Sequence, residues 1–551
     1  MNCQQAQWPG YFPRLVRGAR LAMAVLLSVS LPALTLAARP AQEQIAKQFE
    51  KTFTISAGQA VKIEHKYGEV RLHGEAGHDV RISATIHAQA GSREEAETFA
   101  GKIQIQAEQT GEGVQIRTIY PNEARSWINL HKNPSYSVDY DIAVPGDAMI
   151  FVKNDFGSVT TRGIHGWAEI QNSQGSVNVQ DSGAAKLSNS FGNVDQSNAG
   201  GNVVINNGNG QVTSSNVKGT LSVNNRFGKV SASGIQQSVT ISSSNGAVDV
   251  ADAGDTTINN SFGATAARNV RGNAIINNSN GAIDVSDISG NATLSSSFSG
   301  ITFAKVGGSV FCTGSNGHIR GNTVGGSVIV KTSFGEVALE NVNGEADVND
   351  SNGRISAREI RGYAKLNSSF GAIEASGLHK GVRATTGNDR IALSDIGGDT
   401  YAKTSFGAVD IRRVSGNVTI ENSNGAINAA AIKGDASAKT SFGAATLDDV
   451  GGQISVDNSN GAVVVSVSRG SAACKNISAK TSFSSIQVHI PENVGYNLTG
   501  RTSFGRITSD LPVTTTGEFG GDAMNGKIGN GGCALSLTNS NGSIQILKSA
   551  K

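Results

Sequence analysis

Residues that could bind a metal ion gather near the start of the chain. Four of the nine histidines, His65, His73, His78 and His87, are separated by only 8, 5 and 9 residues. No pair has the i,i+4 spacing of helical ligands, and no cysteine accompanies them. His65 and His73 alternate with apolar residues, as solvent-facing residues of a strand do. We therefore expect surface histidines and no metal site.

Calcium is a second possibility, because rolls built from two nine-residue halves can bind it through turn aspartates. Asp249, Asp284 and Asp410 each stand three residues after a turn glycine. The position is not systematically acidic, since Thr213 and Thr446 occupy it in other turns. We predict no calcium along the chain and no cofactor.

Acid–base catalysis on a polysaccharide would need carboxylates or basic side chains gathered on one face. Glu374, Arg390 and Arg412 are isolated charges in the sequence. Serine-rich triplets such as Thr332-Ser333-Phe334 lack the glycine elbow and the histidine partner of a catalytic nucleophile. The chain is therefore not expected to be an enzyme. The alternative, a carbohydrate-active β-helix enzyme, requires two or three acids or bases on adjacent repeat units.

The most distinctive chemical feature is an alternation of Phe and Asn at fixed intervals. It comprises Phe262, Asn280, Phe298, Asn316, Phe334, Asn352, Phe370, Asn388, Phe406, Asn424, Phe442 and Asn460. Eleven of the nineteen phenylalanines occupy this position. An exposed aromatic strip could bind glycans or apolar partners. In the interpretation that we favour, the rings instead pack along a structural corner and the Asn amides bind turn backbone groups.

The alternation belongs to an internal repeat. Each of these residues precedes the last position of an SFG- or SNG-like triplet, which we call the marker. From 157 to 461 the markers follow one another at fifteen intervals of 18 residues and two of 17 residues. Apolar residues two apart, separated by glycine turns, predict two short strands per unit. Units of constant length stack in register, so we predict an all-β fold, a parallel β-solenoid with 18-residue coils in 36-residue SFG/SNG pairs.

The remaining chain predicts three further regions. Residues 1–38 are expected to be a signal peptide, with a basic segment, a short apolar run and small residues before the cleavage point. Residues 39–150 are expected to be a β-rich region with one short helix, capped by Ser92 and Glu95, that starts the solenoid. The regular solenoid spans 151–461, and 462–551 form irregular coils and a cap, where the markers Ser484, Gly505, Gly526 and Gly542 are unevenly spaced.

Composition narrows the possible partners. The net charge is +2, which provides no global field for nucleic acid or an anionic membrane. No segment of the mature chain is expected to span a bilayer. With Cys3 removed in the signal peptide, Cys312, Cys474 and Cys533 remain. Cys312 and Cys474 fall at the same repeat position, so both are predicted to be buried and unpaired.

The segment IAVPGDAMIFVKNDFGSVTTRGIHGWAEIQNSQGSVNV, which begins at Ile142, resembles the bacterial putative-adhesin domain family of unknown function. That family is related to the head domain of auto-transporter adhesins. The resemblance extends from about residue 50 to the C-terminus. It implies a β-solenoid and a role in adhesion, and it brings no catalytic residues. The ending SNGSIQILKSAK follows directly on the repeats, so self-translocation is not expected.

These features together predict an exported, adhesin-like β-solenoid that binds or scaffolds at the bacterial cell envelope without catalysis. Its partner is expected to be a surface ligand, a glycan or an envelope protein. Its expected location is the periplasm or the cell exterior.

Overall fold

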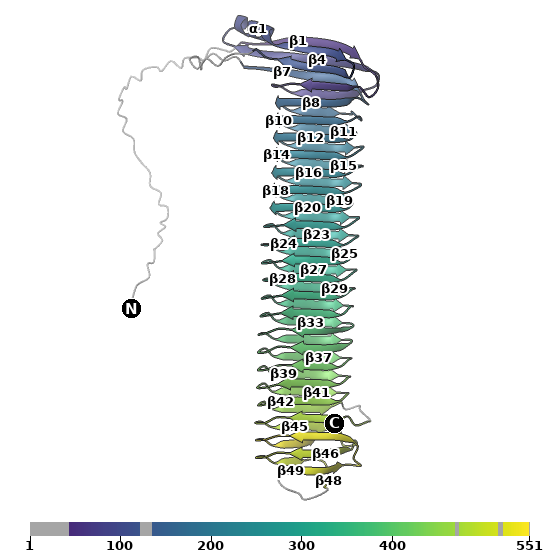
Figure 1. Ribbon diagram of the computed structural model, residues 1–551, viewed down its shortest axis with the longest axis vertical. Helices are drawn as coiled ribbons and strands as arrows, with labels where there is room; N and C mark the ends of the chain where they lie inside the picture. Colours follow the sequence, from purple (N-terminus) through teal and green to yellow (C-terminus); the bar gives the residue numbers. More distant parts are fainter. Residues whose placement is uncertain (1–42, 122–134, 469–472, 516–521, 550–551) are drawn as a thin grey trace, which may run out of the picture.

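The computed structural model describes residues 43–121, 135–468, 473–515 and 522–549. The chain forms a long rod of stacked coils with a broader N-terminal end (Figure 1). Strands hold 64% of the described residues and helix 2%, and the coils repeat at about 18 residues, which confirms the predicted parallel β-solenoid. The predicted signal peptide lies outside the described residues.

Each coil contributes one strand to each of two parallel sheets. Sheet A contains, along the regular part of the rod, β9 (Val159–Arg162), β11 (Val177–Ser182), β13 (Val194–Ala199), β15 (Val212–Val217), β17 (Val230–Ile235), β19 (Val248–Ala253), β21 (Thr265–Val270), β23 (Ile283–Ile288), β25 (Ile301–Val306), β27 (Ile319–Val324), β29 (Val337–Val342), β31 (Ile355–Ile360), β33 (Ile373–Leu378), β35 (Ile391–Ile396), β37 (Val409–Val414), β39 (Ile427–Ile432), β41 (Ala445–Val450) and β43 (Val463–Val467). Sheet B contains β8 (Met149–Phe156), β10 (Ala168–Gln174), β12 (Ala185–Phe191), β14 (Val203–Asn209), β16 (Leu221–Phe227), β18 (Val239–Asn245), β20 (Thr256–Phe262), β22 (Ala274–Asn278), β24 (Ala292–Ser296), β26 (Val310–Gly314), β28 (Val328–Thr332), β30 (Ala346–Asp350), β32 (Ala364–Ser368), β34 (Gly381–Thr385), β36 (Asp399–Lys403), β38 (Val418–Glu421), β40 (Ala436–Thr440) and β42 (Ile454–Asn458).

The core lies between the two sheets. In the coil that begins at residue 407, the buried apolar side chains are the five of the repeat pattern, Val409, Ile411, Val414, Val418 and Ile420. Each pairs in register with its equivalent in the next coil, one repeat further on. A single coil has too few apolar contacts to fold alone, so stability depends on neighbouring coils.

The marker glycines are needed because successive turns pack backbone against backbone. A Cβ atom built on Gly425 would lie only 2.0 Å from the carbonyl oxygen of Gly407 in the preceding coil. The backbone also needs a left-handed residue near the end of most sheet A strands, where one residue per coil adopts this conformation. Examples are Asp395 with φ 60° and Arg413 with φ 56°.

The N-terminal end closes both sheets with antiparallel strands. In sheet A, β1 (Glu43–Thr54), β4 (Asp79–Ala90) and β7 (Ser135–Pro145) are antiparallel neighbours. In sheet B, β5 (Gln104–Thr110) and β6 (Gly113–Ile119) form an antiparallel pair. Helix α1 (Arg93–Lys102) has the predicted N-cap, because Ser92 Oγ accepts a hydrogen bond from the Glu95 N–H at 3.2 Å.

The first coil of the chain is inserted into the stack. Strand β2 (Ala60–Glu64) lies between β6 and β8, and β3 (Val70–Glu75) lies between β7 and β9. The first coil therefore lies next to β8 and β9, and the later strands β6 and β7 cover its other side. Since antiparallel strands then finish each sheet, no regular parallel edge remains at this end for pairing with another chain.

The C-terminal end is built in the same way, with the last coil inserted. Strands β50 (Cys533–Thr538) and β51 (Ile544–Lys548) lie between the coil of β44 (Ile477–Lys480) and β45 (Ile486–Ile490) and the coil of β46 (Tyr496–Arg501) and β47 (Ile507–Ser509). Beyond β46, sheet B ends with the antiparallel strands β49 (Ala523–Ile528) and β48 (Val513–Thr515).

This insertion overturns two predictions. Cys474 is not an unpaired core residue, because it forms a disulfide with Cys533 across a Cα–Cα distance of 5.6 Å. The returning chain brings Cys533 beside the loop that precedes β44. Gly526 is not a turn marker, since it lies inside β49 opposite Leu498. Cys312 is free and buried as predicted, and burial raises the pKa of its thiol to about 12.

Candidate functional site

The predicted Phe/Asn ladder lies at the corner where sheet B turns into sheet A. Its six phenylalanines are exposed, which contradicts the expectation that their rings pack inside the corner. The exposed fractions are Phe262 53%, Phe298 65%, Phe334 53%, Phe370 59%, Phe406 62% and Phe442 64%. Alternation of side-chain direction breaks down in this turn, since Thr404 is buried and Phe406, two residues later, is exposed.

The asparagines of the ladder have the predicted structural role. Five of the six donate a side-chain hydrogen bond to a serine carbonyl in the preceding coil, as Asn280 does to Ser261 at 3.1 Å and Asn424 to Ser405 at 3.2 Å. Asn388 makes no such bond among the residues that the structure describes. The asparagines therefore join consecutive turns, and the phenyl rings stand between them.

The exposed rings continue beyond the ladder in both directions, and we call the full set the aromatic edge. Every member is at least 40% exposed. Its members are Phe156, Phe191, Phe227, Phe262, Phe298, Phe334, Phe370, Phe406, Phe442, Phe483 and Phe504.

The alternation of ring and amide persists at the C-terminal end, although the sequence order does not show it. The inserted last coil places Asn541 in the coil between those of Phe483 and Phe504. Asn541 Nδ2 donates to Ser482 O at 3.1 Å, the same contact that the ladder asparagines make. The Phe504 N–H donates to Ser540 O at 2.9 Å. Alternation is thus a property of the assembled corner.

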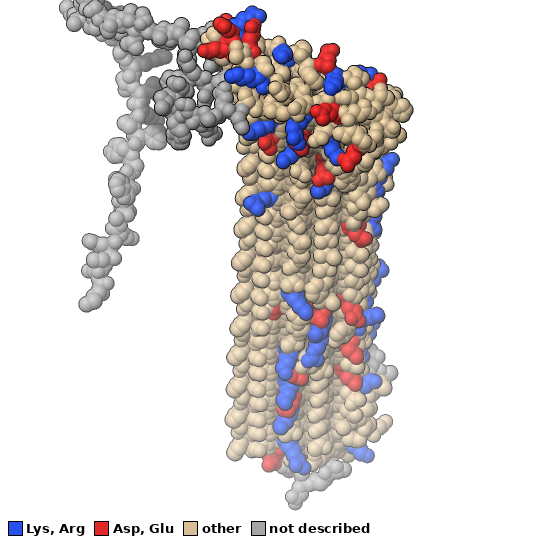
Figure 2. Space-filling view, turned by 45° about the horizontal axis from the view of Figure 1, so that its top comes forward, with Lys and Arg blue, Asp and Glu red and all other residues tan. Residues whose placement is uncertain are grey.

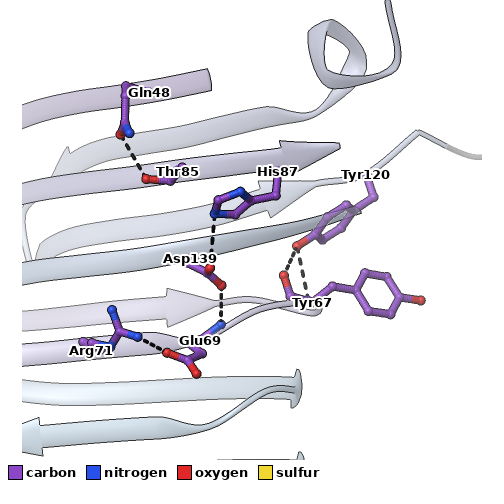
Figure 3. A network of polar contacts seen from close by, with 8 residues as sticks. All are labelled: Gln48, Tyr67, Glu69, Arg71, Thr85, His87, Tyr120 and Asp139. Carbon is purple, nitrogen blue, oxygen red and sulfur yellow. Dashed lines mark hydrogen bonds and ion pairs between the residues drawn. The ribbon is translucent and has the colours of Figure 1, made fainter. Parts of the chain in front are cut away.

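At its N-terminal end the aromatic edge meets a tyrosine cluster. The Tyr67 ring stacks on Phe156 at a centroid distance of 5.3 Å and meets Tyr120 and Tyr136 edge-on. Tyr120 donates its hydroxyl to Tyr67 O at 3.1 Å (Figure 3). Burial raises the pKa of Tyr120, which keeps this hydroxyl protonated. The cluster fixes the ring of Tyr67 at the end of the edge.

The four N-terminal histidines are separated by the fold. His87 Nε2 lies 3.4 Å from Asp139 Oδ2 (Figure 3), and His73 Nδ1 lies 3.2 Å from Asp141 Oδ1. His78 is exposed. Within the described ranges, no three His, Cys, Asp or Glu side chains gather closely enough to hold a metal ion.

His65 is buried, contrary to the expectation of a surface residue. Its side chain is 5% exposed, and its Nδ1 lies 3.0 Å from Thr118 Oγ1. Loss of solvation lowers the pKa of His65 to about 4, so the ring is neutral at neutral pH.

A second ladder at the same corner was missed by the sequence interpretation. We call it the inner ladder. It consists of the buried residues three positions before each marker, all of them polar except for one glycine. Its members are His65, Asn154, Asn172, Asn189, Asn207, Asn225, Ser243, Asn260, Asn278, Ser296, Gly314, Thr332, Asp350, Ser368, Thr386, Thr404, Asn422, Thr440, Asn458, Thr481, Thr502 and Asn539. Asn422 Nδ2 donates to the carbonyls of Gly407 at 2.9 Å and Gly425 at 2.8 Å. The first residue of each NSNG or TSFG segment was the signal that could have revealed it.

Charged side chains are concentrated in the C-terminal half of the rod. Figure 2 shows one face with few charges in the upper part of the rod and columns of basic and acidic side chains in the lower part. Many pair across one coil, as Lys403 does with Glu421 at 2.9 Å and Lys365 with Asp347 at 3.3 Å. These pairs are exposed and contribute little to stability.

Glu374, Arg390 and Arg412 are not isolated, which corrects the sequence interpretation. They line one shallow hollow of about 430 Å³ on the outer face of sheet A. One carboxylate oxygen of Glu374 pairs with Arg390 and the other with Arg354. Partial burial raises the pKa of Glu374, but the hydrogen bonds from the two arginines outweigh it and hold the pKa below its usual value.

Two of the three calcium candidates take part in ordinary side-chain contacts. Asp410 Oδ1 accepts a hydrogen bond from Asn428 Nδ2 at 3.0 Å, and Asp249 lies 3.9 Å from the guanidinium of Arg268. Asp284 forms no hydrogen bond or ion pair within the part of the chain that the structure describes.

No helix in the described ranges is long and apolar enough to cross a membrane. No family model matches the sequence. No curated protein matches it either. Among solved structures, the crystal structure of a putative cell adhesion protein from Clostridium sporogenes ATCC 15579 matches with 10% identity and a TM-score of 0.16, over 37% of this chain and 99% of that one. A likeness this weak carries no argument about function, so membership of the putative-adhesin family stays a prediction.

Proposed function

We propose that this protein is an exported, adhesin-like rod that binds an extended polymer of the bacterial cell envelope along its aromatic edge. The observation that supports this proposal is the regular exposure of eleven phenyl rings on one corner. Apolar side chains scattered singly over a surface need no explanation, but a continuous exposed row of one type marks an interaction surface.

The spacing of the rings favours a linear glycan as the ligand. Rings on alternate coils are about 10 Å apart, too far to stack on one another, given a strand spacing of about 4.8 Å. Each ring is therefore free to stack on a separate unit of an extended chain. The Asn and Ser side chains of the same turns can offer hydrogen bonds to hydroxyl groups between the rings.

The disulfide supports export. Disulfides persist in the periplasm and outside the cell and are rare in the cytosol. The Cys474–Cys533 bond joins the loop before β44 to the inserted last coil. It agrees with the predicted signal peptide and with a location in the periplasm or on the cell surface.

Binding without catalysis is favoured over the carbohydrate-active enzyme. The hollow around Glu374 contains acids and bases on adjacent coils, which that alternative requires. However, the two arginines hold the pKa of Glu374 low, so it is ionised at neutral pH and unsuited to act as a general acid. We propose that this surface retains ligands and does not cleave them.

The test uses an edge variant in which Phe370, Phe406 and Phe442 are all replaced by alanine. Co-sedimentation of the mature protein with purified cell-wall sacculi and with intact cells should fall at least tenfold in this variant. Phe311→Ala is the matched control, because Phe311 is 40% exposed but lies on the face of sheet B, away from the edge. Equal binding by the edge variant, or none by the wild-type protein, would contradict the proposal.

Catalysis is tested in the same samples. We expect no new reducing ends when the protein is incubated with soluble acidic or neutral polysaccharides. Release of reducing ends or unsaturated products that stops in Glu374→Gln would favour the enzyme instead.

A further inference from the structure

The hollow on sheet A is built from four adjacent strands, β31, β33, β35 and β37. Register places Arg358, Ser376, Ser394 and Arg412 directly beside one another in one outward row. The parallel row consists of Ser356, Glu374, Ala392 and Asp410. Small side chains therefore form the middle of a trough of about 430 Å³, and an arginine stands at each end of one row.

The arginines of this trough differ in how they are used. Arg354 and Arg390 are occupied by Glu374. Arg358 and Arg412 are exposed, and their side chains form no ion pair or hydrogen bond with any residue that the structure describes. Their guanidinium groups keep all donors available for a ligand.

The acidic groups nearby have partners of their own. The carboxylate of Glu374 is shared between two arginines, and Asp410 accepts a hydrogen bond from Asn428. Glu340, beside Arg358 on the neighbouring strand, lies outside the trough and accepts one from Asn322 at 3.0 Å. Three arginines and two carboxylates line the trough, and Arg354 adds a further positive charge beside it through its pair with Glu374, so positive charge is in excess.

We propose that this trough binds a segment of an acidic polysaccharide. Arg358 and Arg412 are three strand spacings apart, or about 14 Å, so they can bind two anionic groups along one extended chain. Guanidinium groups bind carboxylates and sulfates through paired hydrogen bonds. Ser376 and Ser394, between the two arginines, supply hydroxyls to the sugar that connects those groups.

A polysaccharide fits this surface better than a peptide or a nucleic acid. All four strands are paired on both sides, so no free edge can take up a peptide strand. Of the apolar residues of the trough, Ala375 and Leu393 are buried and Ala392 is a small, half-buried side chain, so they offer no side-chain pocket. No aromatic side chain lines the trough, so nucleic-acid bases have nothing to stack on.

This site is independent of the aromatic edge, because it lies on the outer face of sheet A and uses none of the phenylalanines. Loss of binding to sacculi or cells in the edge variant and loss of binding to an acidic tetrasaccharide in the arginine variants are therefore distinguishable. Substituting Arg358 or Arg412 is expected to leave folding intact, since both are exposed and unpaired.

The test is isothermal titration of the mature protein with tetrasaccharides at low and high salt. The probes are tetragalacturonate for carboxylates, a heparin-derived tetrasaccharide for sulfates, and cellotetraose as the neutral control. We expect at least one acidic probe to bind, with an affinity that falls as salt rises, and cellotetraose not to bind. The acidic probe that binds identifies the anionic group.

Arg358→Ala and Arg412→Ala are each expected to weaken that binding roughly tenfold, the loss of one charge-assisted contact. Arg226→Ala is the matched control, because Arg226 is exposed on sheet B, and it and the edge variant should bind the probe normally. Circular dichroism melting verifies that each variant is folded. Unchanged affinity in both arginine variants or absence of binding by both acidic probes would overturn the proposal. Equally tight binding of cellotetraose, or of the acidic peptide tetraglutamate titrated in parallel, would also overturn it.

Discussion

The inner ladder and the aromatic edge occupy the same corner, two residues apart, and have opposite environments. Thr404 is buried, whereas Phe406 is 62% exposed. Most of the buried polar residues donate a hydrogen bond to a carbonyl of the turn, as Thr404 Oγ1 does to Asp389 O at 3.1 Å, whereas the hydroxyls of Ser243 and Thr440 have no partner among the described residues. Position within the turn decides burial, and hydrophobicity does not. The inner ladder therefore stabilises the rod, and the exposed rings need a reason other than stability.

The largest expected effect concerns His65, which holds the inner-ladder position of the first coil. Its folded-state pKa of about 4 lies below the unfolded value of 6.5, so unfolding takes up a proton between these values. Stability is complete above about pH 6.5 and is lost as pH falls towards 4, by up to roughly 3 kcal/mol. Chemical denaturation of the N-terminal end as a function of pH measures this loss.

His65→Asn is the control, because asparagine occupies the same place in the next coil at Asn154, where its Nδ2 donates to Gly157 O at 3.1 Å. The variant should lose most of the difference between pH 7 and pH 4. If the stability of the wild type and of the variant responds to pH alike, the claim that His65 is buried and neutral in the folded protein is wrong.

A smaller loss is expected when the inner ladder is interrupted in the middle of the rod. Asn422→Ala removes two donated hydrogen bonds and the one that Asn422 Oδ1 accepts from Gly425 N–H. We expect a loss of about 2 kcal/mol in the free energy of unfolding. Asn422→Thr should lose less than half as much, since Thr404 and Thr440 fill this place in the adjacent coils. Equal losses for Ala and Thr would remove the structural role assigned to the ladder.

Placing a third consecutive ring on the aromatic edge should have a smaller effect still. Asn424→Phe, between Phe406 and Phe442, forfeits the bond from Asn424 Nδ2 to Ser405 O, about 1 kcal/mol. Overpacking adds little because the new ring points to solvent. A loss of 3 kcal/mol or more in a denaturant titration would mean that this side of the corner is packed after all.

The regular coils could be predicted from sequence because the same pattern is repeated at constant spacing. Val409 and Ile411 must both face inward if two-residue alternation is to bury one side of a strand, and Val414, three residues further on, faces inward after the left-handed residue Arg413 shifts the alternation. The two ends could not be predicted, because inserted coils pair strands that are distant in sequence. Nothing in the spacing of Cys474 and Cys533 reveals that the last coil returns past the loop before β44.

The surface could be predicted only in part. Glu374 and Arg390 differ by 16 residues, two short of a full coil, so writing the sequence in 18-residue rows would have placed them near each other on neighbouring coils. The direction of the Phe406 ring could not be read in this way, because the repeat locates a residue in the turn but does not say which side of the corner it faces.

The central claim is that the aromatic edge binds and does not stabilise, and the edge variant tests it when melting and binding are measured on one preparation. We predict that the free energy of unfolding changes by less than about 1 kcal/mol per ring, as expected for largely exposed side chains. Binding to sacculi or intact cells should fall at least tenfold. A loss of about 3 kcal/mol or more per ring, the cost of emptying a packed site, with binding unchanged would contradict it.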